Sequence, residues 1–429
     1  MRVPLAASPL RSALAAAGGP VLLTASVVLV LDAAAAPSFL VPGGVRDFPH
    51  WLAGPFTGLG ERTTWTGFGW LLVTLFGAWL AVLAGVRSLS PRVVIAAIVA
   101  AHVLFLLAPP LLSADIFGYV GFARLSEVHH LDPYVFGTAS APNDPIRTYL
   151  RWHDEKSAYG PLFMVFADML VPLGIAGAVW AFKSIAFAAS LATVALVWRV
   201  AEQRGHDPRL AATLVGLNPV VLAFEVGGGH NDALVVAVTV AGIALIESRR
   251  AAAGAGAFVL GAAMKFTPGL LLPFAFLSHP RERRGIVAGS VVAAGAAAAV
   301  AVAAFGAHAA GILAIVPAAH GGVAAHSVPN ELSLRLTGTG LSDTGRAVAA
   351  ALSAIAIAIT LWRAWRGADW ITCAGWATLA LLLGTAWLLP WYVTWVTPLA
   401  ALGTSRRLRI ATVLFLAYVC ATRVPFLLA

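Results

Sequence analysis

A carboxylate placed directly after a long apolar run is the first candidate for chemistry in this chain. Asp115 follows apolar residues that end near position 112. A charged side chain beside the hydrocarbon layer of a membrane is costly and commonly serves a function. Such a carboxylate could act as a general base that takes a proton from a hydroxyl group. The alternative interpretation is an aspartate that marks a helix end at the membrane interface.

Polar and aromatic side chains continue beyond Asp115 as far as a Gly-Pro pair at positions 160 and 161. An Asp-Pro pair at positions 132 and 133, followed by an aromatic residue, predicts a turn. Aromatic residues at a membrane interface are often only anchors, so each residue of this stretch is weak evidence alone. The candidates here for contact with a ligand are Tyr119, Arg124, Asp132, Tyr134 and Tyr159.

A short glycine-rich segment, Gly227–Asp232, holds a second group of candidates. It places His230, Asn231 and Asp232 after three glycines, and glycine lets a backbone approach a ligand closely. We therefore prefer a binding site here to a plain loop. The spacing of the histidine and the aspartate fits no defined metal motif, so we predict no metal ligands, and a divalent metal stays an open alternative.

Lys265 interrupts another apolar run, together with a Thr-Pro-Gly sequence. A buried lysine needs a counter-charge, which a phosphate group could supply. Lys183 is a second candidate of this kind, and there we prefer an ammonium group that snorkels to the headgroup layer. Trp391 and Tyr392 could equally stack on a sugar ring or anchor a helix.

The composition shows which solvent this chain needs. Its 429 residues are 60% hydrophobic and only 11% charged, whereas soluble domains carry about 25% charged residues. Apolar runs long enough to span the hydrocarbon core recur along the chain, and only helices satisfy their backbone there. The sequence therefore predicts an all-α integral membrane protein, a bundle of about 11–13 transmembrane helices with helices or loops at the extracytoplasmic membrane boundary.

The basic residues predict the orientation of this bundle. The formal charge of +9 comes from arginines that cluster between apolar runs, and cytoplasmic loops carry such an excess. We therefore predict no nucleic-acid partner. This assignment puts the stretch 113–160, Gly227–Asp232, Lys265 and Trp391 on the outer face. It also requires residues 161–175 to lie along the interface or re-enter, with the crossing at 177–198.

The predicted organisation is one multi-spanning domain over residues 1–429 in the plasma membrane. Its extracytoplasmic loops are expected near 37–66, 113–176 and 306–344. Because the polar motifs converge on the outer face, we expect the active site on the extracytoplasmic side.

The ordered set of motifs resembles one family of membrane enzymes. Over about residues 60–400 it is similar to the polyprenol-phosphate-mannose-dependent α-1,6-mannosyltransferases of actinobacterial cell envelopes, which belong to the GT-C glycosyltransferases. The motifs that carry the resemblance are Asp115, Tyr119, Arg124, Asp132-Pro133-Tyr134, Tyr159-Gly160-Pro161, Asn218-Pro219, Gly228-Gly229-His230-Asn231-Asp232, Lys265 and Pro390-Trp391-Tyr392. The chain departs from the expected pattern at His129 and His130, where we expect glycine.

The resemblance implies a mannosyl donor of the polyprenyl-phosphate-mannose type, a glycan or lipoglycan acceptor and a surrounding of membrane lipid. It implies no cofactor beyond the lipid co-substrate. Asp115 would be the catalytic aspartate, and the other candidates would bind substrate. Lys265, helped by Arg124 or His230, would hold the departing phosphate. In-line displacement would invert the sugar carbon.

Other classes of protein share some of these features. A transporter or lipid-linked-sugar flippase also has broken helices and charges in the membrane, but its site lies near the midplane. A membrane ligase or acyltransferase of envelope synthesis is a second alternative. Within the preferred class, arabinose or glucose could replace mannose.

Overall fold

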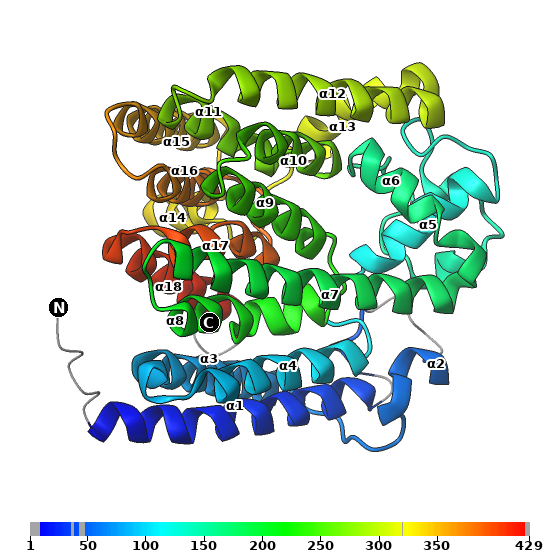
Figure 1. Ribbon diagram of the computed structural model, residues 1–429. Coiled ribbons are helices and arrows are strands. Elements are labelled where there is room, and N and C mark those ends of the chain that lie inside the picture. Colours follow the sequence, from blue (N-terminus) through cyan, green and yellow to red (C-terminus); the bar gives the residue numbers. More distant parts are fainter. Residues whose placement is uncertain (1–8, 36–37, 43–47, 320, 425–429) are drawn as a thin grey trace.

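The computed structural model describes residues 9–35, 38–42, 48–319 and 321–424, and within these ranges the chain is helical with connecting loops and contains no strand (Figure 1). The prediction of an all-α integral membrane protein of the GT-C type is confirmed. Five helical stretches are long and apolar enough to cross a membrane. They are Pro9–Ala34, Trp65–Ser88, Pro161–Gln203, Arg283–Pro317 and Asp343–Trp365.

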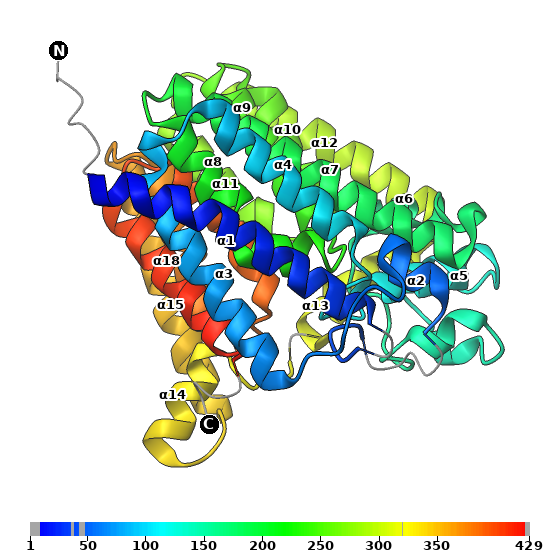
Figure 2. The same ribbon diagram turned by 90° about the horizontal axis from the view of Figure 1, so that it is seen from below.

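Shorter helices complete the bundle. The helices used below are α1 (Pro9–Ala34), α3 (Trp65–Gly85), α4 (Pro91–Leu107), α5 (Asp115–Glu127), α6 (Pro161–Asp168), α7 (Gly174–Gln203), α8 (Pro208–Gly216), α9 (Asp232–Glu247), α10 (Ala251–Met264), α11 (Leu271–Ser278), α12 (Arg283–Phe305), α13 (Ile312–Ala319), α14 (Val328–Thr337), α15 (Asp343–Trp365), α16 (Trp370–Gly384), α17 (Thr397–Leu402) and α18 (Arg406–Ala421). Figure 2 shows α14 projecting from the bundle beside the N-terminal end of α15.

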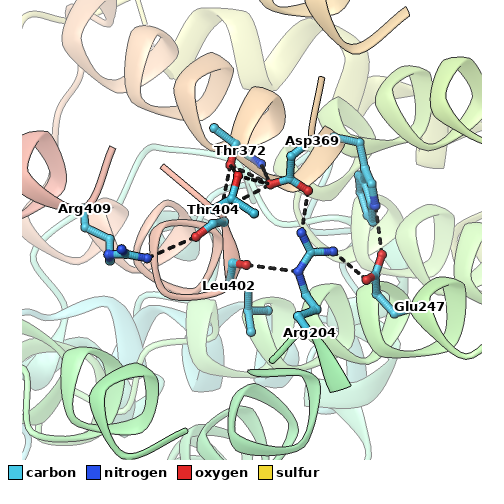
Figure 3. Close-up of polar contacts among 9 residues, drawn as sticks. Arg204, Glu247, Asp369, Thr372, Leu402, Thr404 and Arg409 are labelled. Atoms are coloured by element: carbon cyan, nitrogen blue, oxygen red, sulfur yellow. Dashed lines mark hydrogen bonds and ion pairs between the residues drawn. The ribbon is translucent and has the colours of Figure 1, made fainter. Parts of the chain in front are cut away.

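The connections that carry arginines gather at one end of the bundle. Arg204, after α7, forms ion pairs with Glu247 at the end of α9 and with Asp369 before α16, and it donates to the carbonyl of Leu402 at the end of α17 (Figure 3). Thr372 donates to the same Asp369 carboxylate. Four helix ends are thus joined by one guanidinium group, as expected if these connections share one side of the membrane.

The chain reverses at Lys265, as the broken apolar run predicts. Near the start of α10, Ala252 lies against Gly289 of α12, and further along Gly256 lies against Ala293. The two helices are therefore parallel. The segment that connects them in the chain, which contains α11, must run in the opposite direction. Lys265 ends α10 with an extended backbone (φ −158°, ψ 128°). Because α10 begins soon after Glu247, which pairs with Arg204, Lys265 lies at the end of the bundle away from Arg204.

The stretch 113–160, predicted as a polar loop, contains a buried helix. Helix α5 begins at Asp115, and most of its side chains, including Phe117 and Tyr119, are buried. This helix packs against α6 and α7 in a separate apolar cluster outside the main core. Helix α6 is short and is followed, after a 3-10 turn over Val171–Leu173, by the long α7, and the placement of residues 161–175 along the interface stays a prediction.

Left-handed backbone geometry explains why glycine was expected at the histidine pair. His130 has a φ of 55°, a conformation that glycine adopts far more easily than other residues. Nε2 of His129 beside it donates to the Asp144 carboxylate at 2.6 Å. His130 therefore lies at the turn after α5, and His129 stabilises the following loop through Asp144.

Candidate active site

A large cavity opens at the end of the bundle opposite Arg204. Its volume is about 1440 Å³. Among the predicted residues, Asp115, Tyr159, Lys265, Trp391 and Tyr392 line it. These five come from four separate parts of the chain. The fold therefore brings five of the twelve predicted site residues together around one space that could hold a large substrate.

Asp115 is the cavity-lining carboxylate best placed to act as a base. It begins α5, and 13% of its side chain is exposed. Its Oδ2 lies 3.7 Å from Nε2 of His230. The other ring nitrogen of His230, Nδ1, lies 2.5 Å from the carbonyl oxygen of Phe224 and so must donate to it. In the neutral ring Nε2 then carries a lone pair, and this buried atom has no hydrogen-bond partner in the part of the chain that the structure describes.

His230 itself lies behind the cavity wall rather than in it. Its side chain is buried, and its ring stacks on Trp391 at a centroid distance of 3.8 Å. Burial lowers the pKa of His230 and outweighs the nearby charges of Asp115 and Asp232. The neutral imidazole is therefore favoured. His230 can support Asp115, but it does not touch a molecule in the cavity directly.

The glycines of Gly227–Asp232 allow close contact with other parts of the protein chain. Gly229 has a φ of 66°, and a Cβ there would lie 2.5 Å from a side-chain carbon of Ile116. A Cβ on Gly228 would lie 2.2 Å from the carbonyl oxygen of Phe224. The close approach that glycine permits is therefore to the start of α5 and to the preceding turn, which is a π-helix over Val221–Val226.

Lys265 has its counter-charge inside the protein. Its Nζ lies 2.8 Å from each carboxylate oxygen of Asp232, and Asp232 is fully buried. Trp395 donates to the same carboxylate at 2.6 Å. The ammonium group also lies over the ring of Tyr392, 4.8 Å from its centroid. Asp232 thus supplies the counter-charge that we expected a phosphate could provide to Lys265.

Tyr119 and Asn231 form part of the support beneath Asp115. The Tyr119 hydroxyl donates to Oδ1 of Asn231 at 3.3 Å and accepts from the Asn231 backbone N–H at 3.2 Å. Both residues are buried, and the Tyr119 ring packs edge-on against Tyr159. They tie α5 to the glycine-rich segment and do not line the cavity.

Arg124 lies at the far end of α5 and is engaged elsewhere. Its Nε contacts both carboxylate oxygens of Asp144, at 3.0 and 3.1 Å. Burial raises the pKa of Asp144, but hydrogen bonds from Arg124, the Ile146 backbone and His129 outweigh it, so the pKa is lowered overall. This pair stabilises the loop after α5. The expected contact between Arg124 and the phosphate has no support in this position.

Asp132 and Tyr134 form the predicted turn. Asp132 Oδ1 accepts from the Tyr134 backbone N–H at 2.8 Å, and its Oδ2 lies 3.1 Å from Nδ1 of His308. The Tyr134 hydroxyl donates to the carbonyl of Tyr159 at 2.8 Å. Neither residue lines the cavity. Their contacts hold Tyr159, which does.

Lys183, for which we preferred snorkelling, is fully buried. Its ammonium group donates to the carbonyls of Phe105 at 3.0 Å and Gly227 at 2.7 Å. It thereby joins α4 and α7 to the glycine-rich segment. Trp395, which binds the Asp232 carboxylate, was not singled out in the sequence. Its position one helical turn after Trp391 was the available signal.

A carboxylate-bearing cavity at the end of an all-α membrane bundle is typical of a membrane-embedded glycosyltransferase. The family model described as "Alpha-(1->6)-mannopyranosyltransferase, N-terminal domain" matches residues 21–281, and the one described as "MptB C-terminal domain" matches residues 318–425. The chain belongs to this family of actinobacterial alpha-(1->6)-mannosyltransferases and is a hexosyltransferase.

Individual relatives agree with this assignment. The chain is 30% identical to alpha-(1->6)-mannopyranosyltransferase A of Mycobacterium tuberculosis, in an alignment that covers 80% of this chain and 71% of that one. It is 27% identical to alpha-(1->6)-mannopyranosyltransferase A of Corynebacterium glutamicum over 39% of this chain and 35% of the relative. No solved structure matches the chain.

Proposed function

We propose that this mannosyltransferase takes its sugar from polyprenyl-phosphate-mannose and transfers it to a glycan or lipoglycan acceptor. The reaction takes place on the extracytoplasmic face of the plasma membrane, forms an α-1,6 linkage and inverts the sugar carbon. The observation that carries the proposal is Asp115, the carboxylate that opens to the cavity with an unpaired imidazole nitrogen behind it.

The chemistry requires one proton acceptor. The acceptor hydroxyl oxygen attacks the anomeric carbon, and its proton passes to the Asp115 carboxylate. The bond between that carbon and the phosphate oxygen breaks, and the electron pair leaves with the polyprenyl phosphate. The departing polyprenyl phosphate, a phosphate monoester, is stable as an anion, so no general acid is needed. The Asp115 carboxylate at the cavity wall and a space for two large substrates match this requirement.

The buried polar residues have positioning roles in this reaction. His230 lies behind Asp115, while Lys265 and Asp232 form a neutral pair that fixes the wall carrying Tyr392. Trp391 and Tyr392 line the cavity and could stack on a sugar ring.

The test is transfer of labelled mannose from polyprenyl-phosphate-mannose to a short mannoside by the purified protein. Asp115→Asn keeps the size of the side chain and removes the proton acceptor, so turnover should fall by roughly 10²–10⁴-fold. Donor binding should persist. Asp132→Asn, which alters a carboxylate outside the cavity lining, is the matched control and should reduce turnover far less. Near-normal transfer by Asp115→Asn would reject Asp115 as the base.

A further inference from the structure

One arginine at the cavity has no described partner for its charge. Arg423 follows α18 and lines the cavity. Its Nε is buried and has no hydrogen-bond partner within residues 9–35, 38–42, 48–319 and 321–424. No carboxylate in those ranges pairs with it. A partly buried guanidinium without an anion is costly, since its buried Nε has lost water and gained no partner.

The other cations around the cavity differ from Arg423. Lys265 is neutralised by Asp232, with both oxygens at 2.8 Å. Arg151 and Lys156 line the cavity from the loop before α6, but both are exposed to solvent. Arg423 is therefore the cavity cation that gains most from an anionic ligand.

The surroundings of Arg423 favour a ligand that is part lipid. Helix α3 packs against α18, and the cavity lining at the start of α3 includes Trp65 and Phe68, with Phe39 stacked on Trp65 at 4.2 Å. Trp65 is 57% exposed at this helix end, the level at which tryptophan meets the membrane interface. An apolar chain could therefore reach the cavity from the bilayer along this wall.

A second unpaired donor lies in the same lining. The indole Nε1 of Trp391 is buried and has no hydrogen-bond partner in the part of the chain that the structure describes. Trp391 stacks on His230, which faces Asp115. A phosphate carries several acceptor oxygens, whereas a neutral sugar leaves the guanidinium charge uncompensated. Arginine is also the side chain best suited to bidentate phosphate binding.

We propose that Arg423 binds the phosphate of a lipid-linked ligand at the cavity, with the lipid chain along Phe39, Trp65 and Phe68. The identity of that ligand as the polyprenyl-phosphate donor rests on the proposed function; the phosphate site itself does not. The same chemistry could come from an anionic phospholipid headgroup, and the experiment separates these sources. Arg423 thereby takes the phosphate-binding role that sequence reasoning gave to Lys265 and Arg124.

The probe is polyprenyl phosphate without a sugar, bound to the purified full chain in nanodiscs of zwitterionic lipid. Arg423→Gln should weaken its binding at least tenfold and leave binding of the uncharged polyprenol unchanged. Arg423→Lys, which keeps the charge, should bind with intermediate affinity. Arg151→Gln, at an exposed arginine of the same cavity, is the control and should stay within about twofold of the unaltered protein.

Two outcomes would overturn the proposal. Unchanged affinity for polyprenyl phosphate in a folded Arg423→Gln protein would remove the site, and an equal loss for polyprenol would make Arg423 a residue that only shapes the cavity. Binding of phosphatidylglycerol that depends on Arg423 and is at least as tight as that of polyprenyl phosphate would instead assign the phosphate site to a phospholipid headgroup. Since the probe carries no mannose, a failed transfer assay rejects the proposed function independently of this result.

Discussion

Nε2 of His230 lies 3.7 Å from Oδ2 of Asp115 while Nδ1 of the same ring is committed to the Phe224 carbonyl. Two acceptors that face each other attract a proton between them. When Asp115 takes the proton of an acceptor hydroxyl, the lone pair of His230 can share it. This relationship makes the imidazole a positioning residue for the base, although it is hidden from the cavity.

Replacement of His230 should therefore change the pH profile as well as the rate. Burial lowers the pKa of His230 below its ordinary value of 6.5, so the ring is neutral at pH 7 and becomes protonated only as pH falls through that lowered value. A protonated ring would hold Asp115 ionised and weaken it as a base. The groups that bear on His230 are Asp115, Asp232 and Lys265, and none of them is removed in His230→Gln.

The expected result for His230→Gln is a lower kcat for mannosyl transfer with little change in donor affinity. The acid limb of the profile below pH 6.5 should shift. The measurement is kcat against pH for the variant and the unaltered protein. Ser190→Ala is a control away from the site, because the Ser190 hydroxyl hydrogen-bonds to His102. An unshifted acid limb would show that His230 has only a packing role.

Lys265 and Asp232 should behave as one unit. Lys265→Met leaves the buried Asp232 carboxylate without its ammonium partner, and Asp232→Asn leaves the ammonium without its carboxylate. The double variant removes both charges together. We expect it to be less destabilised than the sum of the single variants, with a coupling of about 0.5–3 kcal/mol. Thermal unfolding of the four proteins in detergent measures this, and simple additivity would contradict the pairing.

We predict that acid destabilises the loop after α5, because this loop contains Asp144. Its pKa is lowered in the folded protein, so its contribution to stability is full above the ordinary value of 3.8 and is lost as pH falls through the lower, folded value. Asp144→Asn should cost about 1–3 kcal/mol at neutral pH, since Arg124 and His129 lose a charged acceptor. The variant should lose less stability than the unaltered protein on acidification, measured by unfolding midpoints. Thr148→Ala, at an exposed hydroxyl of the same loop, is the control.

Accessibility tags test the proposed side of the membrane. A cysteine placed within residues 140–150 should react with an impermeant reagent added to whole cells, because this stretch lies at the end of the bundle that carries the cavity. A cysteine at Arg283, at the start of α12, should be protected, since α12 begins at the opposite end. The reverse pattern would place the cavity on the cytoplasmic side and reject the lipid-linked donor.

The sequence by itself determined the class of fold and the position of the breaks between helices. Its hydrophobic content and apolar run lengths leave the bilayer as the only solvent, and Lys265 with Thr-Pro-Gly cannot continue a helix across it. The grouping of Asp115, Lys265 and Trp391 at one end of the bundle also followed from the sequence, because arginine-rich connections predict the direction of each crossing.

Only the tertiary structure decided which polar residues face the cavity and which support it. Asp232 and Arg124 look like equal candidates in the sequence, yet one neutralises Lys265 and the other binds Asp144. In the sequence, Arg423 is simply one arginine at the end of an apolar run. Its charge becomes relevant to ligand binding only because α18 ends against the cavity. The physical reason is that the cost of a buried charge depends on its partners across the fold, and pairs such as Trp395 with Asp232 lie 163 positions apart in the chain.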